Sequence, residues 1–101
     1  MERIQVAHIR EQGMDLILVP LDGSFRQRSK DEQRRIRAAL QACATTAGMD
    51  GTVVPVWDAG DGRMAFLAPV EAHRFLKTID LGYVLDHLDG ELSWGGVTDT
   101  H

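Results

Sequence analysis

Leu16-Ile17-Leu18-Val19-Pro20 is the stretch that decides the fold of this 101-residue chain. Every position in it is apolar, whereas a strand with one solvent-exposed face alternates apolar and polar side chains. Such a run is typical of a strand that lies inside a sheet and is covered on both faces. Because proline cannot donate a ladder hydrogen bond, we expect the strand to end near Pro20.

The segment before this run predicts its first neighbour in the sheet. Residues 3–8 alternate between the two faces of a strand, and Glu11-Gln12-Gly13 supplies a turn. A hairpin is therefore expected over residues 3–10 and 15–20. His8 falls on the more apolar face of its strand, where a histidine is ordinarily half-buried and bonded to a neighbour.

A helix is predicted after the central strand. Ser29-Lys30-Asp31-Glu32 has the form of a capping box, in which the serine hydroxyl and the glutamate carboxylate each accept a first-turn backbone N–H. The helix should begin at about residue 30 and end at Gly48. One apolar stripe runs along it, made of Ile36, Leu40, Cys43 and Ala47.

A second hairpin is expected over residues 52–57 and 63–67. Both segments are rich in β-branched or apolar residues, and Asp58-Ala59-Gly60-Asp61-Gly62 between them is a dense turn signal. Pro55 predicts that the first of these strands lies at a sheet edge or carries a bulge, since proline removes a ladder donor.

Two further helices are predicted after this hairpin. Pro69 stands at the first turn of one, and a short third helix, with Leu81, Val84, Leu85 and Leu88 on one side, should end at Gly90. The predicted fold class is α+β: a single four-stranded sheet of two hairpins with helices packed on it, in the order ββαββαα. Residues 1–94 should form one domain, and the Gly-rich segment 95–101 a flexible tail.

Composition narrows the class of protein. A 44% hydrophobic and 26% charged chain of this length is ordinary for one globular domain. The single cysteine, Cys43, excludes an intrachain disulfide, and the N-terminus lacks the pattern of a secretion signal. The longest apolar run is far shorter than a membrane span requires, so we expect a cytoplasmic protein without a membrane partner.

Charge is distributed unevenly along the chain. The segment 26–37 holds six cations against Asp31 and Glu32, a net charge of +4, which leaves −8 for the rest of a chain whose net charge is −4. Lys30, Arg34 and Arg37 are spaced four and three apart, so they share a helix face. The predicted partner-binding residues are Arg26, Arg28, Lys30, Arg34 and Arg37. The alternative interpretation is a solvated helix face with ion pairs such as Asp31–Arg35.

No catalytic, metal or cofactor site is predicted. The four histidines and the cysteine lack the spacing of a metal site, and Cys43 lies on an apolar stripe, where a thiol is unreactive. The turn 58–62 lacks the length and the terminal glutamate of a calcium loop. No serine lies in a nucleophile elbow.

The sequence therefore predicts a small non-catalytic interaction module, such as an inhibitor, an adaptor or an immunity-type factor, that binds a macromolecular partner through charge complementarity. A protein is the preferred partner. The alternative is a nucleic-acid-associated accessory factor using the segment Arg26–Arg37, which is weakened because Phe25 is the only aromatic residue near it. A third alternative is an enzyme with an unidentified pocket. A homodimer is also expected, since short hairpins leave sheet edges that a second chain can complete.

Overall fold

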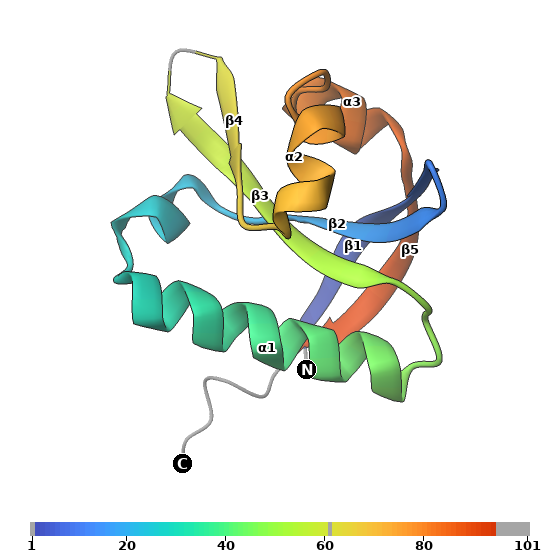
Figure 1. Ribbon diagram of the computed structural model, residues 1–101. Helices are drawn as coiled ribbons and strands as arrows, with labels where there is room; N and C mark the ends of the chain where they lie inside the picture. Colours follow the sequence, from blue (N-terminus) through green and yellow to red (C-terminus); the bar gives the residue numbers. More distant parts are fainter. Residues whose placement is uncertain (1, 61, 95–101) are drawn as a thin grey trace.

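The computed structural model describes residues 2–60 and 62–94, and in these residues five strands and three α-helices are present (Figure 1). The strands are β1 (Glu2–Glu11), β2 (Met14–Pro20), β3 (Thr52–Gly60), β4 (Arg63–Phe66) and β5 (Leu88–Trp94). The helices are the 3₁₀ helix η1 (Gly23–Gln27), α1 (Lys30–Thr46), α2 (Val70–Leu76) and α3 (Leu81–Asp86). The predicted α+β class and the order of its first seven elements are confirmed, but the sheet gains a fifth strand.

β2 lies at the centre of this sheet, whose strand order is β4-β3-β2-β1-β5. It is antiparallel to β1, with Leu16 opposite Ile9, and parallel to β3, with Ile17 opposite Val53. Residues 16–19 are all buried and the strand ends at Pro20, as predicted. Because β2 and β3 run parallel, they need a crossover connection, and α1 supplies it.

The helices cover both faces of the sheet. Figure 1 shows α1 on one side of the strands and α2 and α3 on the other. The core on the α1 side contains Val6, Ile17, Val19, Leu40, Ala44, Val53 and Leu92. The core on the α2–α3 side contains Ala7, Ile9, Leu16, Leu18, Val54, Val56, Ala72, Leu76 and Val84. Successive side chains of β2 thus pack in opposite cores, which is why the whole run must be apolar.

Both predicted hairpins are present. For the strand that contains Pro55, the predicted edge position is wrong, whereas an irregularity is present but lies away from the proline. β3 is an interior strand between β2 and β4, and its irregularity lies between Asp58 and Gly60. Pro55 faces the point where β4 ends: its carbonyl accepts the N–H of Leu67 at 3.0 Å. In an extended strand the N and the C=O of one residue point to the same side. The missing donor of Pro55 therefore lies opposite the end of β4, and the pairing with β2 is undisturbed.

The short third helix is present, but its predicted end at Gly90 is wrong. α3 ends at Asp86, and the following residues form β5, which pairs antiparallel with β1. Leu88 and Leu92 are four residues apart, a spacing that places two side chains on one face of a helix and also on one face of a regular strand. The periodicity of the sequence therefore could not distinguish a helix from a strand here. The two leucines instead lie on opposite faces of the sheet, because β5 has one extra residue, Asp89, opposite the step from Val6 to Ala7 of β1, and this bulge changes the facing of β5.

Two expectations from the sequence concern the ends of the chain and membranes. The predicted flexible tail, residues 95–101, lies outside the described residues. Within the described part of the chain, the structure contains no helix long and apolar enough to cross a membrane.

Candidate interaction surface

The segment that carries the predicted cations begins with η1, which is anchored to the sheet. The Asp22 carboxylate accepts the N–H of Ser24 at 2.8 Å and starts the turn. Phe25 is only 4% exposed and packs against Trp57 of β3, with ring centroids 4.7 Å apart and planes inclined at 59°. This aromatic pair holds η1 in one place on the sheet.

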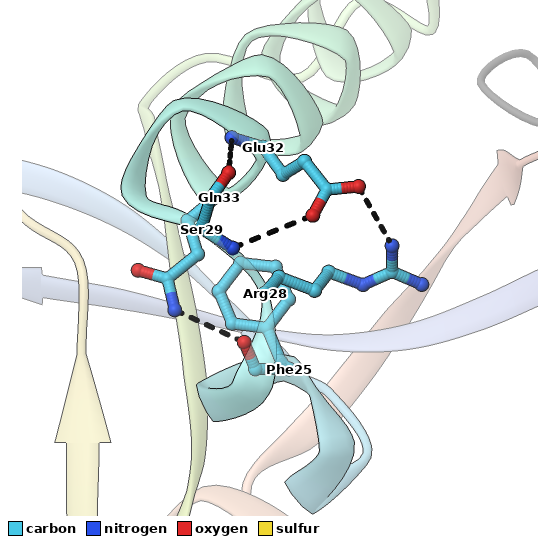
Figure 2. A network of polar contacts seen from close by, with 5 residues as sticks. All are labelled: Phe25, Arg28, Ser29, Glu32 and Gln33. Carbon is cyan, nitrogen blue, oxygen red and sulfur yellow. Dashed lines mark hydrogen bonds and ion pairs between the residues drawn. The ribbon is translucent and has the colours of Figure 1, made fainter.

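The predicted capping box joins η1 to α1 and is confirmed (Figure 2). The Ser29 hydroxyl accepts the N–H of Glu32 at 3.1 Å, and the Ser29 N–H donates to the Glu32 carboxylate at 3.4 Å. Figure 2 also shows the Gln33 side-chain amide, which donates to the carbonyl of Phe25 at 3.0 Å. The turn between the two helices is therefore fixed by contacts on both sides, and the cations project from an ordered backbone.

We call the five predicted cations, Arg26, Arg28, Lys30, Arg34 and Arg37, the basic surface. The first two flank the turn. The Arg26 guanidinium donates to the carbonyl of Ala59 at 3.2 Å, so it reaches the end of β3. Arg28 pairs with the Glu32 carboxylate at 3.6 Å, as drawn in Figure 2.

The other three cations lie on α1 but differ in exposure. Lys30 and Arg34 are exposed, and Arg34 pairs with Asp31 at 3.5 Å, in place of the Asp31–Arg35 pair of the alternative interpretation. Arg37 is half-buried. Its flank of the helix continues to Gln41, one turn later, whose side chain bonds the start of β3. The basic surface therefore runs from a solvent-exposed face at the helix start toward the sheet.

The ion pairs within the basic surface are too weak to compete with the carboxylates of a partner. The side chains of Arg28 and Glu32 are 48% and 47% exposed, and those of Arg34 and Asp31 are 69% and 84% exposed. Pairs this exposed typically contribute about 0–1 kcal/mol to stability. A partner's carboxylates could replace these contacts at little cost.

An open cavity of about 400 Å³ adjoins the basic surface. It is lined by Gly23, Ser24, Arg26, Gln27, Asp58 and Gly60, so it lies between η1 and the end of β3. The Asp58 carboxylate accepts the N–H of Gly60 at 2.8 Å. Guanidinium, amide, hydroxyl and carboxylate groups thus surround one space, which suits a hydrogen-bonding side chain of a partner.

Sequence reasoning missed this cavity. Turn chemistry fully accounts for Asp58 and Gly60, which shape the end of the hairpin. Their proximity to Arg26 follows from the packing of η1 on β3, which joins residues more than 30 positions apart. No short motif in the sequence signals that proximity.

The described histidine rings are engaged with backbone carbonyls. His8, His73 and His87 have ring nitrogens 2.8, 2.9 and 2.7 Å from the carbonyl oxygens of Asp50, Ala68 and Tyr83. His8 is exposed, not half-buried as expected, although its ring is bonded to a neighbour as expected. Among the described residues no group of three or more side chains has the arrangement of a metal site.

Comparison of the chain with protein-family models, with curated proteins and with solved structures finds no match. Function is therefore inferred from the geometry and charge of the chain itself.

Proposed function

We propose that this protein is a non-catalytic interaction module that binds an acidic protein partner through the basic surface. One observation carries the proposal: in a chain of net charge −4, exposed cations are concentrated on a turn that is fixed by a capping box and a buried aromatic residue. An ordered backbone limits the entropy lost on binding. The same cations on a loose segment would have to be ordered by the partner.

Charge complementarity explains what such a surface would achieve. Opposed charges raise the rate of association and exclude partners of the wrong sign, while adding little to the stability of either protein. The polar cavity beside Arg26 would then receive one side chain of the partner and fix the orientation of the complex. The inhibitor, adaptor and immunity-type roles all need this combination of rapid and selective binding.

A nucleic-acid partner fits the surface less well. Single-strand binding proteins combine cations with exposed aromatic rings on which bases stack. The two aromatic residues next to the basic surface, Phe25 and Trp57, are 4% and 7% exposed and pack against each other with inclined rings. They contribute to the core and leave no ring available for a base.

The proposal is tested with two triple variants of equal charge change. The surface triple carries Arg28→Glu, Lys30→Glu and Arg34→Glu. The control triple carries Arg3→Glu, Arg10→Glu and Arg74→Glu. All six side chains are exposed, and each triple breaks two exposed ion pairs, so the two variants match in net charge and in lost contacts.

Proteins of the native host are captured on the immobilised wild type and on both triples, with and without nuclease treatment, at low and moderate salt, and quantified by mass spectrometry. We expect an acidic protein that binds the wild type and the control triple, is lost from the surface triple, and elutes as salt screens the contact. Equal capture by the two triples would contradict the proposal. Capture that disappears on nuclease treatment would favour the nucleic-acid alternative.

A further inference from the structure

The two edges of the sheet differ in their fitness for pairing with a second copy of the chain. The β5 edge carries Asp89 and Glu91, both exposed. Two copies pairing antiparallel through β5 about Gly90 would set Asp89 of one copy opposite Glu91 of the other. Like charges placed directly opposite each other destabilise a strand pair. This like-charge contact and the bulge at Asp89 disfavour the pairing of β5 with itself in that register.

The β4 edge carries no such protection. Its only charged residue is Arg63 at the start of the strand, and the following Met64, Ala65 and Phe66 are apolar and partly exposed. Val70, at the start of α2, is an apolar side chain that is 76% exposed. Apolar edge strands are the sites at which a second chain adds to a sheet.

The pairing of β4 with β3 determines which backbone groups point outward. The N–H of Leu67 donates to Pro55 of β3, so the backbone of Leu67 faces β3. Facing alternates along a strand, so Ala65 also faces β3, in agreement with its position opposite Trp57. The N–H and C=O groups of Met64 and Phe66 therefore point away from β3, to the open edge of the sheet.

We propose that this protein forms a homodimer in which two β4 strands pair antiparallel about a two-fold axis at Ala65. In this register Met64 of each copy lies opposite Phe66 of the other, and each such pair exchanges two hydrogen bonds. All four outward groups of each copy are then satisfied. A register shifted by two residues would place Phe66 on the axis and Met64 opposite Ala68. The carbonyl of Ala68 is already bonded to His73, so this register is less favourable.

The side chains agree with this register. Ala65 of one copy would lie opposite Ala65 of the other in a non-hydrogen-bonded pair. The Cα atoms of such a pair approach to about 4.5 Å, so a small residue fits best. Each Arg63 would lie opposite Leu67 of the other copy. The two Arg63 residues would be about 13 Å apart along the strands, beyond the screening length at physiological salt. The dimer interface shares no residue with the basic surface, so the dimer proposal does not rest on the proposed partner binding.

The first test is the oligomeric state, measured by sedimentation velocity from micromolar to hundreds of micromolar protein. We expect a concentration-dependent dimer for the wild type. Ala65→Glu would place two carboxylates across the axis and should give monomer over the same range. Ala42→Glu, on the exposed face of α1, adds the same charge elsewhere and should leave the dimer unchanged. A wild type that stays monomeric throughout, or an Ala65→Glu variant that dimerises like the wild type, overturns the proposal.

The second test reads the register and keeps the proposal falsifiable if Ala65→Glu fails to fold. In a Cys43→Ala background, Ala65→Cys should form an interchain disulfide under mild oxidation, because Cα atoms about 4.5 Å apart lie within disulfide reach. Arg63→Cys should not, since about 13 Å exceeds that reach. Cross-linking of Arg63→Cys as fast as Ala65→Cys, or of neither variant, overturns the register.

Discussion

Replacing Gln41 by alanine should destabilise the protein more than the loss of a surface glutamine normally does. β4 pairs with β3 only from Val56 onward, so the first part of β3 has no strand on that side. The Gln41 side chain occupies this place: its carbonyl oxygen accepts the N–H of Val53 at 2.8 Å, and its amide donates to the carbonyl of Gly51 at 3.0 Å. The Gln41 side chain thus makes the two hydrogen bonds that a neighbouring strand would otherwise make to Gly51 and Val53.

The magnitude follows from burial. Val53 is 0% exposed, so its N–H would lose its partner without gaining water, and such a group costs about 1–3 kcal/mol. Gly51 is only partly buried and its carbonyl can be hydrated. Alanine's better helix propensity returns only a few tenths of a kcal/mol. We expect a loss of about 2 kcal/mol, which for a domain of this size lowers the melting temperature by about 8–16 °C.

The assay is urea denaturation followed by circular dichroism, with calorimetry for the melting temperature. Gln33→Ala is the matched control, because Gln33 is also partly buried on α1 but its side chain makes one hydrogen bond, to the carbonyl of Phe25. That variant should lose about 0.5–1.5 kcal/mol. If Gln41→Ala costs no more than Gln33→Ala, with the same denaturant slope, the Gln41 side chain does not support β3.

Ser29→Ala should cost about 0.5–2 kcal/mol, near the low end because the capping box is exposed, and the urea midpoint checks it. A midpoint equal to that of the wild type would mean that the hydroxyl does not cap α1. Leu18→Ala should cost about 2–5 kcal/mol, because Leu18 is fully buried in the central strand. Leu85→Ala, on a 55% exposed side chain, should cost far less, and similar losses for the two variants would contradict the placement of β2 at the core.

Locally encoded features of this fold are predictable from the sequence. The apolar run 16–19 requires burial on both faces, whatever its neighbours are. The capping box at Ser29 depends on atoms three residues apart, so its geometry is set as soon as the chain turns into a helix. The same holds for the cations of the basic surface: helical spacing alone places Lys30 and Arg34 together, although it does not reveal that Arg37 is half-buried.

The tertiary structure decided the features that depend on distant partners. Leu88 and Leu92 suit a helix and a strand equally, and the free edge of β1 selected the strand, since pairing satisfies a whole row of backbone groups that a short helix would leave to water. Pro55 is tolerated inside the sheet only because β4 ends opposite it. The cavity beside Arg26 exists only because Phe25 packs on Trp57. In each case the residue itself is compatible with several structures. The structure that forms is the one in which it meets the unpaired backbone groups or the apolar surface of a segment far along the chain.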